Sequence, residues 1–91
     1  MKKAFTATAF ERRIKDLSDE HHGELVEIIK RVAECYGHPH KHLGLGIRKL
    51  PGYLECRDSL DNRLVFEEEG DALVFVYYGT HDEVKRMLRN A

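Results

Sequence analysis

The chain has 91 residues, enough for one domain and too few for two, so we expect a single domain over residues 1–91. Hydrophobic residues make up 42% of it, which argues against disorder, and no apolar run approaches the roughly 18 residues that a membrane helix needs. The formal net charge of −1 is uninformative by itself, but residues 37–63 carry five basic and three acidic side chains, which would suit an anionic partner. This excess is far weaker than the dense basic patch of a typical nucleic-acid binder.

The N-terminal residues "MKKAFTATAFERR" begin like a signal peptide, but Glu11, Arg12 and Arg13 soon interrupt the apolar stretch. We therefore expect a mature cytoplasmic protein. Cys35 and Cys56 form no CxxC pair. They could form one disulfide, but two thiols in a reducing cytoplasm are the stronger expectation.

The first 37 residues predict a strand followed by two helices. The β-prone segment 3–8 predicts a short strand. The capping-box spacing of Thr8 and Glu11 predicts a first helix, and Ser18 or Asp19 can cap a second one. Apolar residues recur at helical spacing along this second helix, and they are Leu25, Ile28, Ile29, Val32, Ala33 and Tyr36.

The rest of the chain predicts a four-stranded meander and a short closing helix. The strands are expected at residues 45–50, 53–57, 63–68 and 72–78. The last of them, "ALVFVYY", is almost continuously apolar, which predicts a strand buried on both faces or covered by the helices. Thr80 and Glu83 predict a second capping box, at the start of a helix over about 82–89. This order predicts an α+β fold with a helical hairpin on one face of an antiparallel sheet.

Candidate functional residues lie in the middle of the chain and just after its last strand. His81 falls in the first turn of the closing helix, where backbone N–H groups favour an anion and an imidazole can exchange protons with a phosphate. A solvated, idle histidine is the alternative. Arg57 ends a strand, and we expect Arg48, Lys49 and Arg63 on its sheet face, where they could hold phosphate oxygens. Solvated strand charges are the alternative there.

Three histidines, His38, His40 and His42, alternate in "GHPHKHLG". In an extended loop they would project to one side, at a spacing that can ligate zinc, nickel or copper. A structural zinc site usually needs four ligands, and no cysteine is close in the sequence. We therefore expect a polar loop that binds no metal, and we expect no cofactor.

The order of elements and "RKLPGYLECRDSLDNRLVFEEEGDALVFVYYGTHDEVKRML" resemble the RelE/ParE toxin superfamily of bacterial toxin–antitoxin systems. The resemblance is strongest over residues 48–88. It implies a RelE-like fold and a cytoplasmic toxin of a type II system, held inactive by a cognate antitoxin that covers apolar surface on the helices and the sheet edge. In the RelE/YafQ-like branch it implies a metal-independent mRNA interferase that cleaves messenger RNA on the ribosome and so inhibits translation. The alternative is a ParE-like gyrase inhibitor, or an inactive or attenuated relative that only binds an antitoxin.

The resemblance also implies roles for individual residues. Arg57 matches a strand arginine that steadies the phosphate, and His81 matches the proton-transferring histidine of a "GTH" motif. Asp61 matches an acidic residue of the YafQ-like catalytic set, and His42 falls near a further active-site histidine. The candidate RNA contacts are Lys41, Arg48, Lys49 and Arg63.

Two departures from the family pattern favour the non-catalytic alternative. Active members usually carry an arginine near the end of the last strand, where this chain has Tyr77 and Tyr78. The family is also typically strongly basic, whereas this chain is nearly neutral. The histidines favour the nuclease.

Overall fold

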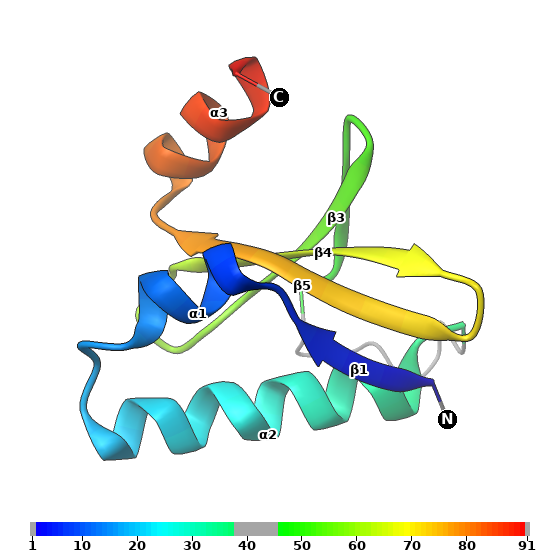
Figure 1. Cartoon of the computed structure of the whole chain (residues 1–91), viewed down its shortest axis with the longest axis horizontal. Helices are drawn as coiled ribbons and strands as arrows, with labels where there is room; N and C mark the ends of the chain where they lie inside the picture. Colours follow the sequence, from blue (N-terminus) through cyan, green and yellow to red (C-terminus); the bar gives the residue numbers. More distant parts are fainter. Residues whose placement is uncertain (1, 38–45, 91) are drawn as a thin grey trace.

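The computed structural model describes residues 2–37 and 46–90 (Figure 1). The segment with His38, His40, Lys41 and His42 therefore lies outside the described residues, and so does the predicted metal-free loop. The elements in chain order are β1 (Lys3–Thr6), α1 (Thr8–Ile14), α2 (Asp19–Cys35), β2 (Arg48–Leu50), β3 (Tyr53–Arg57), β4 (Arg63–Glu69), β5 (Ala72–Gly79) and α3 (His81–Arg89).

The five strands form one sheet in the order β1-β5-β4-β3-β2. The predicted α+β fold and antiparallel meander from β2 to β5 are confirmed. β1 pairs parallel with β5, with Lys3 opposite Ala72, so the sheet is mixed and not antiparallel throughout. The two helices connect β1 to the opposite edge of the sheet, and β1 takes the edge of β5 that the meander leaves unpaired.

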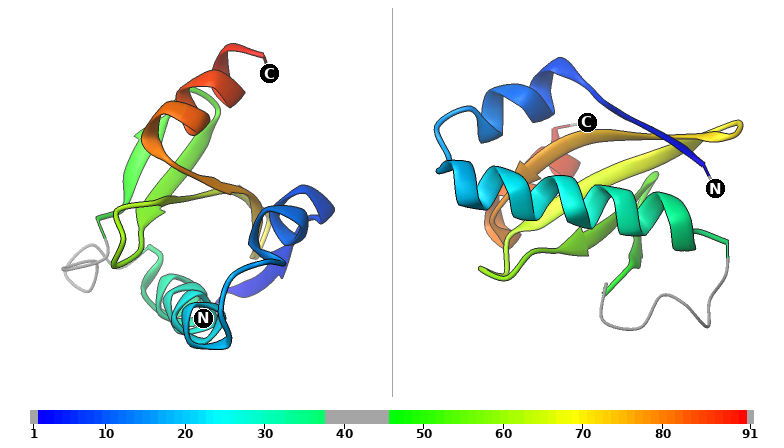
Figure 2. Two further views of the ribbon diagram at one scale, coloured as in Figure 1. Left: turned by 90° about the vertical axis from the view of Figure 1, so that its left-hand side faces the viewer. Right: turned by 90° about the horizontal axis from the view of Figure 1, so that it is seen from below.

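The core lies between the sheet and the helical hairpin. Figure 2 shows α1 and α2 on the same side of the sheet, while α3 projects from the end of β5. Leu73, Phe75 and Tyr78 of β5 are buried, whereas the intervening Val74 and Tyr77 are only partly buried. Because burial alternates along β5, helices cover one of its faces and it is not buried on both.

The three predicted helices are present, and two of their predicted side-chain caps are confirmed, at Ser18 and Thr80. The Ser18 hydroxyl accepts a hydrogen bond from the His21 N–H at 3.1 Å. The predicted box at Thr8 is wrong, because Ala7 is the N-cap of α1 and makes no side-chain cap. The Ala7 N–H still donates to the Phe75 carbonyl at 2.8 Å, so the helix begins directly where the contact with β5 ends.

Candidate active site and partner surface

Strand register brings several candidate residues to one end of the sheet. Arg57 pairs with Arg63, and Arg63 pairs with Gly79, the last residue of β5. Side chains of paired residues share a face, so Arg57 and Arg63 lie on the face opposite the helical hairpin, which we call the outer face. His81 begins α3 two residues after Gly79, so the topology places it at this same end of the sheet.

The outer face does not include every expected arginine and lysine. Arg48 pairs with Glu55 and Lys49 pairs with Leu54, a partly buried neighbour of the core. Because adjacent strand residues point to opposite faces, Lys49 lies on the other face from Arg48. The expectation that both share one face with Arg57 is therefore wrong for Lys49.

Asp61 lies between two arginines. Its Oδ1 is 2.9 Å from Arg63 Nη1 and 3.4 Å from Arg57 Nη1. Its backbone is in the left-handed region, at φ 63°, which aspartate tolerates better than most residues. The hydrogen bond and charge of Arg63, and then those of Arg57, lower the pKa of Asp61. Asp61 is therefore a carboxylate that orients Arg57, and it is poorly suited to donate a proton.

Arg63 is less available to a ligand than its sequence position indicates. Only 6% of its surface is exposed, and its Nε lies 3.0 Å from Oε2 of Glu55, which is 4% exposed. Neither of these two atoms has a hydrogen bond of good geometry, so the contact is an ion pair. Glu55 thus neutralises Arg63, and Arg57, whose side chain is 46% exposed, is the more accessible cation.

His81 is exposed at the first position of α3. The predicted capping box is confirmed: the Thr80 N–H donates to Glu83 Oε1 at 2.8 Å, and the Glu83 N–H donates to Thr80 Oγ1 at 3.2 Å. The Thr80 hydrogen bond and the Arg13 guanidinium lower the pKa of Glu83. The Thr80 and Glu83 side chains together occupy two N–H groups at this helix end, so the site offers a phosphate fewer donors than a bare helix N-terminus.

The tyrosines that replace the family arginine have different surroundings. Tyr77 pairs with Val65 on the outer face, and the Arg13 guanidinium lies 4.6 Å from its ring centroid. Arg13 Nε also donates to the Tyr78 carbonyl at 2.6 Å, and its Nη2 lies 2.6 Å from Glu83. The structure thus brings a cation from α1 to the end of β5. Sequence reasoning missed it because 64 residues separate Arg13 from Tyr77.

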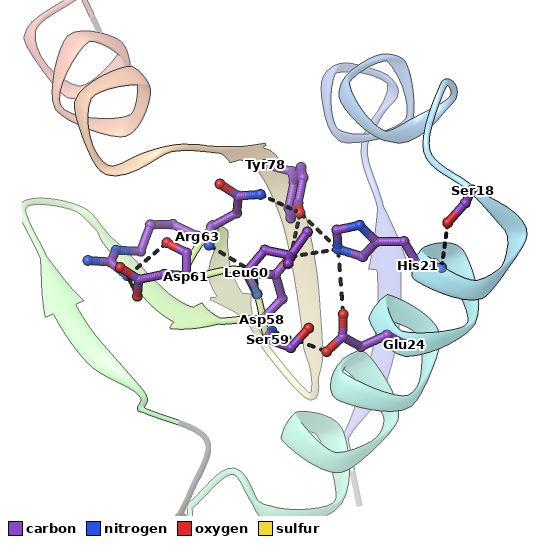
Figure 3. Close-up of polar contacts among 10 residues, drawn as sticks. Ser18, His21, Glu24, Asp58, Ser59, Leu60, Asp61, Arg63 and Tyr78 are labelled. Atoms are coloured by element: carbon purple, nitrogen blue, oxygen red, sulfur yellow. Dashed lines mark hydrogen bonds and ion pairs between the residues drawn. The ribbon is translucent and has the colours of Figure 1, made fainter.

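Tyr78 belongs to a second polar cluster, on the hairpin side of the sheet. Asp58 Oδ2 accepts hydrogen bonds from the Tyr78 hydroxyl and from His21 Nε2, the latter at 2.8 Å. Burial and the bond to Asp58 raise the pKa of Tyr78. Figure 3 shows His21 and Tyr78 pointing at Asp58, with Asp61 and Arg63 lying farther from α2. Sequence reasoning missed this cluster, because its only local signal was the aspartate that opens the "DSLDN" turn.

The turn between β3 and β4 connects these two clusters. Asp58 Oδ1 accepts hydrogen bonds from the N–H groups of Leu60 and Asn62, both at 2.9 Å. The Asp58 carboxylate therefore closes the turn that contains Asp61, and it also contacts α2 through His21. The N–H groups on either side of Asp61 are both bonded to Asp58, so the turn fixes the position of Asp61.

An apolar hollow of about 670 Å³ lies between β1 and α2. Phe5 of β1 is 54% exposed there. β1 is the outermost strand, so its outer edge has no strand partner within residues 2–37 and 46–90. The residues that line the hollow are Lys2, Lys3, Ala4, Phe5, Ile29, Lys30, Ala33 and Glu34. An extended peptide with acidic and apolar side chains suits such an edge.

Comparison with solved structures supports the fold. The RelB–RelE antitoxin–toxin complex from Methanococcus jannaschii matches with a TM-score of 0.65 and 20% identity, over 91% of this chain and 96% of that one. A copper-bound mutant toxin from Helicobacter pylori matches with a TM-score of 0.67 and 20% identity, over 92% and 99%. YafQ from E. coli strain BL21(DE3) matches with a TM-score of 0.66 and 17% identity, over 92% and 98%.

No family model matches the sequence, and no curated protein matches it significantly. None of the helices that the structure describes is both long and apolar enough to cross a membrane. The structural matches nevertheless extend over nearly the full length of each toxin. The chain therefore has the fold of the RelE- and YafQ-type toxins.

Proposed function

We propose that this protein is the toxin of a type II toxin–antitoxin system and cleaves messenger RNA on the ribosome in the cytoplasm. The observation that carries the proposal is the meeting of Arg57, Asp61 and the His81-bearing start of α3 at one end of a RelE-type sheet. A nuclease of this kind needs a proton-transfer group and a cation for the phosphate.

Each residue has a distinct role in this proposal. The ribose 2′-oxygen attacks the adjacent phosphorus, and the bond to the 5′-oxygen of the next nucleotide breaks. His81 transfers a proton in this step, because its imidazole is exposed and an imidazole can take a proton from a hydroxyl or give one to a leaving oxygen. Arg57 neutralises charge on the phosphate oxygens. Asp61 holds Arg57 in position, and no metal ion takes part. His42 and Lys41 remain candidates for the same site.

A gyrase inhibitor or a purely antitoxin-binding relative is the second candidate. Its support is that Glu55 neutralises Arg63 and Glu83 neutralises Arg13, which leaves Arg57 as the most accessible of these three guanidinium groups. A cleavage site with one available cation stabilises a dianionic transition state less well.

Induced expression separates the candidates. We expect growth arrest, relief by the small protein encoded next to this gene, and new 5′ ends in translated messages, mapped by primer extension. Loss of DNA supercoiling with intact messages would support the gyrase inhibitor instead. Unimpaired growth with abundant folded protein would contradict both kinds of toxin.

A further inference from the structure

One imidazole and two carboxylates converge on the hairpin side of the sheet. His21 and Glu24 lie one turn apart on α2, and Asp58 faces them from the turn after β3 (Figure 3). His21 Nε2 lies 2.8 Å from Asp58 Oδ2 and 3.5 Å from Glu24 Oε1. All three donor atoms lie within 4.8 Å of one another.

The charges of this cluster do not balance. Two carboxylates face one imidazole, which carries at most one positive charge. The Asp58 side chain is fully buried, and those of His21 and Glu24 are 12% and 32% exposed. Arg31 and Arg57 line a neighbouring hollow, but in the described part of the chain neither pairs with Glu24 or Asp58. A divalent cation would compensate the excess negative charge at this poorly solvated position.

The spacing suits a small four-coordinate ion. Ligand bonds of about 2.0–2.1 Å in a tetrahedron place ligand atoms about 3.3 Å apart. The His21–Glu24 separation of 3.5 Å is close to this value, and the His21–Asp58 contact of 2.8 Å needs to open by about 0.5 Å. The Glu24 and Asp58 oxygens, which lie within 4.8 Å of each other, must also reach this separation. His21 and Glu24 line an open hollow of about 400 Å³, together with Ser18 and Leu60, so water can supply a fourth ligand.

We propose that His21 Nε2, Glu24 Oε1 and Asp58 Oδ2 bind one Zn²⁺ ion, with water as the fourth ligand. Zinc binds the neutral imidazole whose proton is on Nδ1. The Nε2 proton that His21 donates to Asp58 therefore moves to Nδ1 in a neutral ring, or leaves to solvent from an imidazolium. The Tyr78 hydroxyl stays bonded to Asp58 and orients it. The ion is structural and fixes α2 to the turn that carries Asp61. None of the three ligands is a residue of the proposed cleavage site, so zinc binding is tested separately from the proposed metal-free cleavage.

The test uses full-length, untagged, chelator-treated protein carrying His40→Ala and His42→Ala, which reduces competition from the histidine-rich segment. Titration with ZnCl₂ should show one equivalent bound and a raised melting temperature. Glu24→Gln keeps the side-chain volume but removes the charge, and it should weaken zinc binding about tenfold or more. Glu27→Gln, on the exposed side of the same helix, should bind zinc like the parent protein. MgCl₂ should not bind, because imidazole is a poor ligand for that ion.

Equal zinc affinity in the parent and in Glu24→Gln would overturn the proposal, as would the absence of binding in the parent. Melting of the metal-free variants shows whether folding is intact. If Glu24→Gln fails to fold, His21→Gln takes its place, since this side chain is partly exposed and its loss leaves the sheet core unchanged. Unaltered zinc binding by His21→Gln would be equally decisive against the site.

Discussion

Arg63 is a charged strand residue whose side chain is held by contacts within the protein, so it is poorly available to a ligand. Its guanidinium contacts buried Glu55 on one side and exposed Asp61 on the other. The sequence predicts a solvated cation at this position, because an isolated strand does not reveal that its opposite face is also covered. Arg63 Nη1 lies 2.9 Å from Asp61 Oδ1, so Arg63 also helps to hold the turn between β3 and β4 in place.

Replacement of Arg63 by Met should lower the free energy of unfolding by about 3–5 kcal/mol, because Glu55 is left buried without its cation. The same change at exposed Arg12 should cost less than about 0.5 kcal/mol. Urea denaturation measures both values. The double change Glu55→Leu with Arg63→Met should recover most of the loss, because no buried charge is then left unpaired. If it does not, the loss in Arg63→Met does not come from the unpaired Glu55.

The Cys56 thiol makes the free energy of unfolding decrease as the pH rises above about 9. Burial, and then the negative charges of Glu55 and Asp58, raise its pKa from 9.0 to about 12. The folded state therefore retains a proton that the unfolded state loses. This contribution is complete below pH 9 and disappears as the pH rises through about 12. Between these values the free energy of unfolding should fall by up to about 1.4 kcal/mol per pH unit from this group.

Urea denaturation at several pH values from 8 upward measures this slope. Cys56→Ala should have a shallower slope, whatever its overall loss of stability, because it has no thiol to ionise. Parallel slopes for the two proteins would contradict the buried, protonated thiol.

At the scale of secondary-structure elements, the sequence predicted most of the fold because its turns carry strong local signals. β3 was predicted with its observed bounds, and β4 and β5 to within one residue at their ends. The strand expected over residues 45–50 is shorter, since β2 begins at Arg48. The cluster of His21 and Asp58 was not predicted, because it joins positions 37 residues apart that only the packed hairpin brings together.

Thr80 caps α3, which carries His81. Thr80→Ala should lower the free energy of unfolding by about 1 kcal/mol, because the Glu83 N–H loses its acceptor. Thr8→Ala is the matched control. It should cost only a few tenths of a kcal/mol, since α1 has no side-chain cap. Chemical denaturation compares the two, and equal losses would contradict the assigned caps.

At the scale of the whole molecule, the edge of β1 and the proposed cleavage site lie on different parts of the surface. The hollow beside Phe5 is lined by β1 and α2, whereas Arg57 and His81 lie at the far end of the meander. We expect an antitoxin segment to add to the edge of β1 and to bury Phe5. Because the two regions are separate, antitoxin binding at β1 and the proposed cleavage should respond to different substitutions.

Phe5→Asp should weaken antitoxin binding about tenfold or more, because it places a charge in an apolar contact. Leu60→Asp, which also changes an exposed apolar residue but lies in the β3–β4 turn, should have a much smaller effect. Calorimetric titration with the purified antitoxin measures both. Unchanged affinity of Phe5→Asp would place the partner elsewhere.

Cleavage of a programmed messenger RNA by the purified protein, with and without ribosomes, tests the central claim most directly. We predict cleavage only with ribosomes, a loss of about 10²–10⁴-fold in rate for His81→Ala, and a similar loss for Arg57→Ala. Both variants should melt like the wild type because both side chains are exposed, and His22→Ala should cleave normally. Wild-type rates in His81→Ala would contradict its assigned role, and no cleavage by folded wild-type protein would contradict the nuclease itself.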